Sequence, residues 1–121
     1  MNHKTVLFIE DENLLNEAYQ KQFGQKYNCL FATTGSEGLN LAQTKKPDLI
    51  ILDLILPGGQ NGFDVLRQLK QLKETKDIKV VVLTNLEDEK ETVLEDGALD
   101  CLVKANTNMA AIAETIDKHL Q

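Results

Sequence analysis

The chain has 121 residues, of which 42% are hydrophobic and 26% charged, and 13 Lys and Arg against 19 Asp and Glu give a formal net charge of −6. This length and composition predict one globular domain whose core needs neither disulfides nor a structural metal. The negative charge and the lack of a basic cluster argue against direct nucleic-acid binding, and no apolar run approaches the ~20 residues of a membrane span.

The N-terminal residues run directly into a predicted strand and leave no room for a signal peptide. The two cysteines, Cys29 and Cys101, lie inside apolar segments without the spacing of metal ligands, which favours buried, reduced thiols. We therefore expect a cytoplasmic protein that does not contact membranes.

Short apolar runs alternate with segments of helical periodicity along the whole chain. In chain order, the pattern predicts a strand at 5–9, a helix from 14 to about 24, a strand at 28–32, a helix between 34 and 47, a central strand within 47–57, a helix at 63–72, a strand at 79–84, a helix within 87–96, a strand at 100–103 and a helix at 109–120. This alternation predicts parallel strands joined by right-handed crossovers. The predicted fold is a doubly wound, flavodoxin-like α/β domain with five strands in the order 2-1-3-4-5 and five helices.

Local signals support several of these helices. Thr34, followed three residues later by Glu37, predicts a capping box at the start of the second helix. Gly97 is a plausible C-cap for the fourth helix, which has six acids between Glu87 and Asp96 and is expected to be strongly solvated on one face.

The central strand carries the least expected residue of the chain. Four aliphatic residues at 49–52 predict a strand buried on both faces, and Asp53 follows them directly. A buried carboxylate is unfavourable unless a cation, a metal or hydrogen-bond donors meet it. Taken alone, Asp53 is best explained as a residue that closes its strand by bonding nearby backbone N–H groups.

The ends of the other predicted strands change that interpretation. Because parallel strands end at the same edge of a sheet, the residues that follow them should meet in space. Those residues are Glu10, Asp11, Asp53, Thr84 and Lys104. Three carboxylates form a hard oxygen site suited to Mg²⁺, and a hydroxyl with an ammonium supplies donors for a phosphoryl group. Each residue alone has an ordinary explanation, but the combination predicts phosphoryl chemistry.

Four segments carry a resemblance to a known family: Phe8–Glu12, Leu52–Pro57 with Gly62 beyond, Leu83–Thr84 and Gly97–Lys104. Together they identify the sequence as similar to the receiver domain of response regulators in two-component signalling, with residues 1–121 forming a single, CheY-like receiver.

The resemblance implies that Asp53 is the phosphoacceptor and takes a phosphoryl group from a histidine kinase or a phosphotransfer protein. It also implies that Glu10, Asp11, Asp53 and the backbone carbonyl of Ile55 bind Mg²⁺, while Thr84 and Lys104 contact phosphoryl oxygens. The product would switch a protein-interaction surface that acts on a downstream target or a fused effector domain. Such a chain is not an enzyme in the usual sense, because it reacts only at its own aspartate.

The sequence departs from the family pattern at four places. Cys101 stands where an aromatic switch residue is usual, Ala105 where a proline follows the lysine, and Asn85 where a small residue is common. The loop at 57–62 is one residue longer than usual. Asn85 is expected to narrow access to Asp53, and the output is expected to use a route other than the aromatic switch.

Three other functions are alternatives to a phosphorylated receiver. A pseudo-receiver would use the same fold as a scaffold without phosphorylation, which the missing aromatic and proline favour but the complete acid, hydroxyl and lysine set opposes. An aspartyl phosphohydrolase typically has a second acid two residues after its nucleophile, where this chain has Ile55. A flavin carrier would need a phosphate loop after the first strand, where the acids at 10–12 would repel phosphate.

Overall fold

A computed structural model describes residues 3–121. Residues 1 and 2 lie outside this description. Two predictions include them, namely the receiver domain at 1–121 and the absence of a signal peptide at the N-terminus. The strands are β1 (Thr5–Ile9), β2 (Asn28–Ala32), β3 (Leu49–Leu52), β4 (Lys79–Thr84) and β5 (Asp100–Val103). The helices are α1 (Asn13–Phe23), α2 (Gly35–Lys45), α3 (Gly62–Gln71), α4 (Lys90–Glu95), the 3₁₀ helix η1 (Lys104–Asn106) and α5 (Met109–Leu120).

The five strands form one parallel sheet in the order β2-β1-β3-β4-β5, which confirms the predicted topology. The register pairs Ile9 with Leu52 and Thr84 with Val103. Strand ends that are distant in sequence therefore lie side by side, and the residues that follow them share the carboxyl edge of the sheet.

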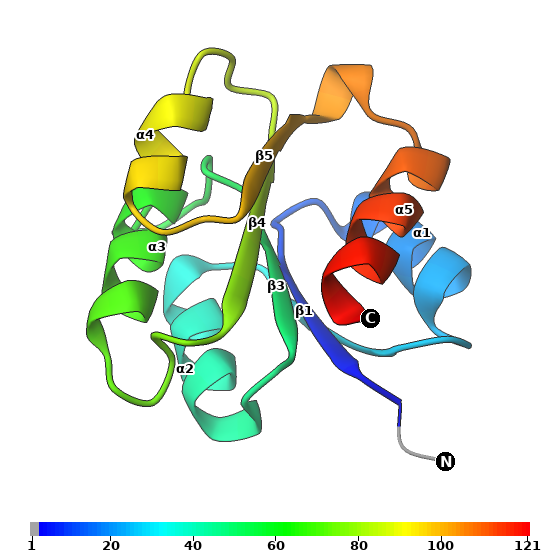
Figure 1. Cartoon of the computed structure of the whole chain (residues 1–121), viewed down its shortest axis with the longest axis horizontal. Coiled ribbons are helices and arrows are strands. Elements are labelled where there is room, and N and C mark those ends of the chain that lie inside the picture. The colour runs from blue at the N-terminus through cyan, green and yellow to red at the C-terminus, as the bar shows by residue number, and fades with distance from the viewer. Residues whose placement is uncertain (1–2) are drawn as a thin grey trace.

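Helices cover both faces of the sheet, with α2, α3 and α4 on one side and α1 and α5 on the other (Figure 1). The core on the α2–α4 side is aliphatic and contains residues such as Leu52, Leu66 and Val82. The core on the α1–α5 side contains an aromatic stack in which Phe8 lies 4.6 Å from Tyr19 and 5.4 Å from Phe31 between ring centroids. Strand β3 is buried on both faces, as its unbroken aliphatic sequence predicts.

Details at the helix ends differ from the sequence prediction. Thr34 caps α2 by accepting from the Glu37 N–H, but the Glu37 carboxylate accepts from the Thr33 N–H rather than from Thr34, so the predicted capping box is wrong in its second half. A complete capping box instead opens α3, between Asn61 and Asp64. The acidic fourth helix is shorter than its charge pattern indicates and begins only at Lys90.

Within residues 3–121, no helix combines the length and apolarity needed to cross a bilayer.

Candidate functional site

The strand ends assemble the acidic cluster that the sequence predicts. Carboxylate oxygens of Glu10, Asp11 and Asp53 all lie within 4.8 Å of one another. Glu10 and Asp53 are buried, whereas Asp11 is exposed. Three carboxylates at this spacing can hold a hard divalent cation, and the one exposed carboxylate leaves the cluster open to solvent on one side.

Lys104 reaches this cluster from the end of β5. Its Nζ lies 2.7 Å from Asp53 Oδ2, 2.5 Å from Glu10 Oε1 and 3.7 Å from Glu12 Oε2. The Lys104 side chain is only 13% exposed, so the ion pairs are shielded from water. The lysine therefore supplies the cation that a buried carboxylate at position 53 requires.

Burial and ion pairing shift the pKa values of Glu10 and Lys104. Burial raises the pKa of the Glu10 carboxyl above its ordinary value, although the Lys104 ammonium works in the opposite direction. For Lys104, burial acts to lower the pKa, but hydrogen bonds to Asp53 and Glu10 outweigh it and the pKa rises above its ordinary value. The lysine is thus held in its charged form at neutral pH.

Backbone groups hold the two buried acids in place. Asp53 Oδ1 accepts from the Ile55 N–H at 3.2 Å, which is the local backbone bond expected of an aspartate at a strand end. Glu10 Oε2 accepts from the Glu12 N–H at 3.1 Å, and the Asn16 side chain donates to the Glu10 carbonyl at 2.8 Å. One oxygen of each acid is fixed by backbone, and the other faces Lys104.

Gly62 is required at its position by a close approach to the backbone of Asp53 and Leu54. A Cβ at residue 62 would lie 2.1 Å from the Asp53 carbonyl oxygen and 2.4 Å from the Leu54 Cα. The Gly62 N–H also donates to the Leu54 carbonyl at 2.8 Å. The start of α3 therefore packs directly against the strand end that presents Asp53.

Thr84 ends β4 and is fully buried. Its Oγ1 accepts from the Leu86 N–H at 3.3 Å, so the hydroxyl proton remains available for donation. Asn85, the next residue, lines a cleft of about 250 Å³ together with Asp11, Glu12, Asp53, Ile55 and Lys104. Thr84 does not line this cleft. The five residues predicted from the strand ends therefore lie at one edge of the sheet, but the Thr84 hydroxyl is buried beneath the surface.

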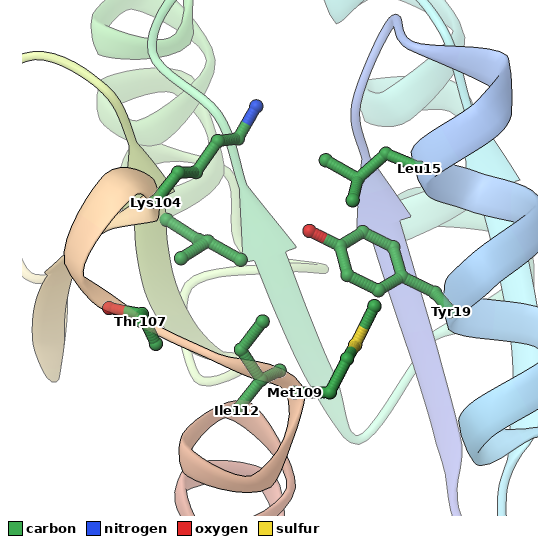
Figure 2. A pocket seen from close by; sticks show the side chains of 7 residues that line it. Leu15, Tyr19, Lys104, Thr107, Met109 and Ile112 are labelled. Carbon is green, nitrogen blue, oxygen red and sulfur yellow. The ribbon is translucent and has the colours of Figure 1, made fainter.

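A second, apolar cavity of about 100 Å³ lies between α1 and the segment that leads into α5. Figure 2 shows the Lys104 side chain extending past this cavity, with its nitrogen directed away from Thr107 and Ile112. Tyr19 and Met109 line the same space from α1 and α5. The aliphatic part of the lysine is packed here while its ammonium reaches the acids.

The positions that depart from the family pattern occupy definite places. Cys101 is buried in the aliphatic core beside Val93 and Ala98, where burial raises the pKa of its thiol. Ala105 donates its N–H to Asn85 Oδ1 at 3.1 Å. Neither this bond nor the contacts of Glu12 and Asn16 with the Glu10–Lys104 pair was predicted, because spacing in the sequence does not specify which loops meet.

The chain belongs to the family of the response regulator receiver domain, whose sequence profile matches residues 6–117. The transcriptional regulatory protein AfsQ1 of Streptomyces coelicolor is 35% identical over 103 residues, which cover 83% of this chain and 44% of AfsQ1. The chain spans less than half the length of this and other curated relatives that it matches.

Solved structures agree with this assignment. Chemotaxis protein CheY4 of Vibrio cholerae is 25% identical, with a TM-score of 0.86 over 98% of this chain and 99% of CheY4. The BeF3-activated N-terminal receiver domain of RstA from Klebsiella pneumoniae is 26% identical, with a TM-score of 0.85 over 98% of this chain and 99% of that domain. The resemblance stated from the sequence, and the fold that it implied, are both confirmed.

Proposed function

We propose that the chain accepts a phosphoryl group on Asp53 from a histidine kinase or a phosphotransfer protein, in a reaction that depends on Mg²⁺. The observation that carries the proposal is the buried Asp53 carboxylate, paired with Lys104 at 2.7 Å and grouped with Glu10 and Asp11 beside a cleft. A salt bridge needed only for stability has no use for two further acids and an opening to solvent.

In the proposed reaction, an Asp53 carboxylate oxygen forms a bond to phosphorus while the phosphorus–nitrogen bond of the donor phosphohistidine breaks and its electron pair returns to the imidazole. The product is an acyl phosphate, and water later hydrolyses it to restore the carboxylate. Lys104 offsets the negative charge on one side of Asp53. The Thr84 hydroxyl, which is buried and does not line the cleft, would move toward the cleft to donate to a phosphoryl oxygen. Mg²⁺, held by Glu10, Asp11, Asp53 and the Ile55 carbonyl, would screen the remaining charge.

The residues of the site do not favour the alternative of a pseudo-receiver. Its acids, hydroxyl and lysine are all at the carboxyl edge of the sheet, and Lys104 already contacts Asp53. The chain would change only its own aspartate and would pass the signal to a downstream protein or a fused effector domain. We place this exchange in the cytoplasm, where free thiols such as those of Cys29 and Cys101 remain reduced.

The test is the intact mass of the chain after incubation with Mg²⁺ and acetyl phosphate. We expect a phosphoryl adduct that is stable in acid and labile in base, that is lost when a chelator removes the metal, and that does not form in Asp53→Asn. An adduct that persists in Asp53→Asn would contradict the assignment of the phosphoacceptor. Absence of both an adduct and Mg²⁺ binding would favour the pseudo-receiver.

For the partner surface we propose the acidic segment that runs from Glu87 through α4. Glu91 and Leu94 are exposed there, and Leu94 provides apolar area beside the acids. Charge reversal at Glu89 or Glu91 should weaken binding of the downstream partner in a pull-down with the phosphorylated chain. Unchanged binding in both variants would direct attention to another face.

A further inference from the structure

One side chain joins the two loops that follow β4 and β5. Asn85 Oδ1 accepts from the Ala105 N–H at 3.1 Å, and these residues come directly after Thr84 and Lys104. In the described part of the chain, no other side-chain hydrogen bond links residues 85–89 to residues 104–108. The bond therefore connects the loops that carry the two donors of the proposed phosphoryl site.

Both partners of this bond are among the four departures from the receiver pattern. A proline at 105 would have no N–H and could not donate. A small side chain at 85 would be too short to accept from the neighbouring loop. The bond therefore needs both departures.

Beyond this bond, each loop is held to its own strand, and the Lys104 ammonium is also held by Asp53 and Glu10. The Leu86 N–H donates to Thr84 Oγ1 at 3.3 Å, and Thr107 Oγ1 donates to the Val103 carbonyl at 2.7 Å. Asn85 also lines the cleft that holds Asp53 and Lys104, so a change in its position alters the site itself. Among the described residues, no other side-chain hydrogen bond joins the two loops, so without the Asn85–Ala105 bond their separation is set by the β4–β5 pairing and by the ion pairs of Lys104.

We propose that Asn85 is a positioning residue for phosphorylation of Asp53, which acts with the Ala105 N–H to hold the loop that carries Lys104 against the loop that follows Thr84. The proposal rests on the proposed function of the site. A donor such as Lys104 that is held in place before the reaction stabilises the transition state without reorganisation, and a looser donor slows the chemical step rather than binding of the phosphodonor.

The experiment measures the rate of adduct formation against acetyl phosphate concentration for the wild type, Asn85→Ala, Ala105→Pro and the double variant. We expect Asn85→Ala to lower the saturating rate about two- to tenfold, the range set by one neutral hydrogen bond. The half-saturating phosphodonor concentration and the Mg²⁺ affinity should stay within about twofold, since no hydrogen bond of the described residues joins Asn85 to Glu10, Asp11 or Asp53. Because both substitutions break the same bond, the double variant should be no slower than the slower single variant.

The matched control is Asn28→Ala, which removes an exposed hydrogen bond to Thr5 at the opposite edge of the sheet and should leave the rate unchanged. Amide hydrogen exchange at Ala105 reports on the bond directly and should become faster in Asn85→Ala, which keeps the test decisive if Ala105→Pro does not fold.

If the wild type is phosphorylated but Asn85→Ala has the same saturating rate, the positioning role is wrong while the proposed function stands. The same conclusion follows if the rate losses of the two single variants multiply in the double variant. A wild-type chain that neither forms an adduct nor binds Mg²⁺ would overturn the proposed function, and this inference with it.

Discussion

Lysines are paired with acids near both edges of the sheet, but the two arrangements differ in burial. At the carboxyl edge, Lys104 lies between Glu10 and Asp53 and is 13% exposed. Near the amino edge, Lys26 lies 3.0 Å from Asp117, and these side chains are 64% and 32% exposed. Water can solvate the second pair whenever it opens, whereas opening the first would leave two acids buried without a partner.

The difference teaches that charge pairing alone does not identify a functional site. The Lys26–Asp117 pair, which Tyr27 joins through its hydroxyl, connects the end of α5 to the segment before β2, and among the residues that the structure describes it belongs to no group of three or more acids. The Lys104 cluster includes such a group beside a cleft, and it brings together residues from three strand ends. Four substitutions at the two edges should differ in the size of their effects on stability and on phosphorylation.

The largest effect is expected from Lys104→Met, which removes the charge and keeps most of the side-chain volume. Leaving Glu10 and Asp53 unpaired should lower the free energy of unfolding by about 3–5 kcal/mol at neutral pH. Phosphorylation should slow by about 100-fold or more, as for other preorganised donors. Urea denaturation and the adduct assay measure the two effects. Stability should recover as the pH falls and Glu10, whose pKa burial raises, becomes protonated, and a loss that does not depend on pH would contradict the charge explanation.

The next effect is steric and comes from Gly62→Ala. The added Cβ would overlap the backbone of Asp53 and Leu54, so the start of α3 or the strand end must move. We expect a loss of about 3 kcal/mol in the free energy of unfolding together with slower phosphorylation. Gly59→Ala is the matched control, because a Cβ there meets nothing within 4 Å. Equal stability of the two variants in denaturant titrations would show that the contact at Gly62 relaxes freely.

A smaller effect of opposite sign is expected from Glu10→Gln in the absence of Mg²⁺. Because burial raises the pKa of Glu10, its charged form is less favourable in the folded chain than in the unfolded chain, and stability falls as the pH rises through that pKa. The amide should therefore raise the melting temperature at pH 7 by about 2–5 °C. The gain should shrink as the pH falls through the raised pKa and disappear below about 4.3, the ordinary value.

If the proposed Mg²⁺ site is right, the ion should raise the melting temperature of the wild type, and the same Glu10→Gln variant should lose most of that rise in differential scanning calorimetry. Glu17→Gln, an exposed acid on α1, serves as the control and should change neither quantity. A lower melting temperature in Glu10→Gln at pH 7 would mean that pairing with Lys104 outweighs burial.

The smallest effect is expected at the exposed pair. Asp117→Asn should reduce the free energy of unfolding by about 1 kcal/mol or less and leave phosphorylation unchanged. Hydrogen bonds from Tyr27 and Lys26 hold the pKa of Asp117 below its ordinary value, so this contribution is present at neutral pH and is lost as the pH falls through the lowered pKa. Chemical denaturation at neutral and acidic pH tests it, and a loss comparable to that of Lys104→Met would remove the distinction between the edges.

The sequence predicts the fold and the membership of the site because both follow from periodicity. Alternating strands and helices require parallel strands, and parallel strands bring residues such as Asp53 and Lys104 to one edge whatever their separation along the chain. Gly62 follows the Leu52–Pro57 motif in the sequence, but only the packing of α3 against Asp53 shows why a glycine is required there.

Contacts between loops could not be predicted in the same way. The bond from Ala105 to Asn85 depends on how two loops fold, and no local pattern encodes their approach. The Glu37 carboxylate accepts from the Thr33 N–H rather than from Thr34, and the spacing of Thr34 and Glu37 in the sequence does not distinguish these two donors. The sequence indicated that residues 85 and 105 were unusual, but only the structure shows that they contact each other.

The most direct measurement of the central claim is to locate the phosphoryl group by chemical trapping. The chain is incubated with Mg²⁺ and acetyl phosphate and then reduced with borohydride, which converts an acyl phosphate on aspartate to homoserine, and peptides are sequenced by mass spectrometry. We predict homoserine at residue 53 alone, and only when Mg²⁺ is present. Modification at Asp11 or another acid in place of residue 53, or modification that does not need the metal, would contradict the account of this site.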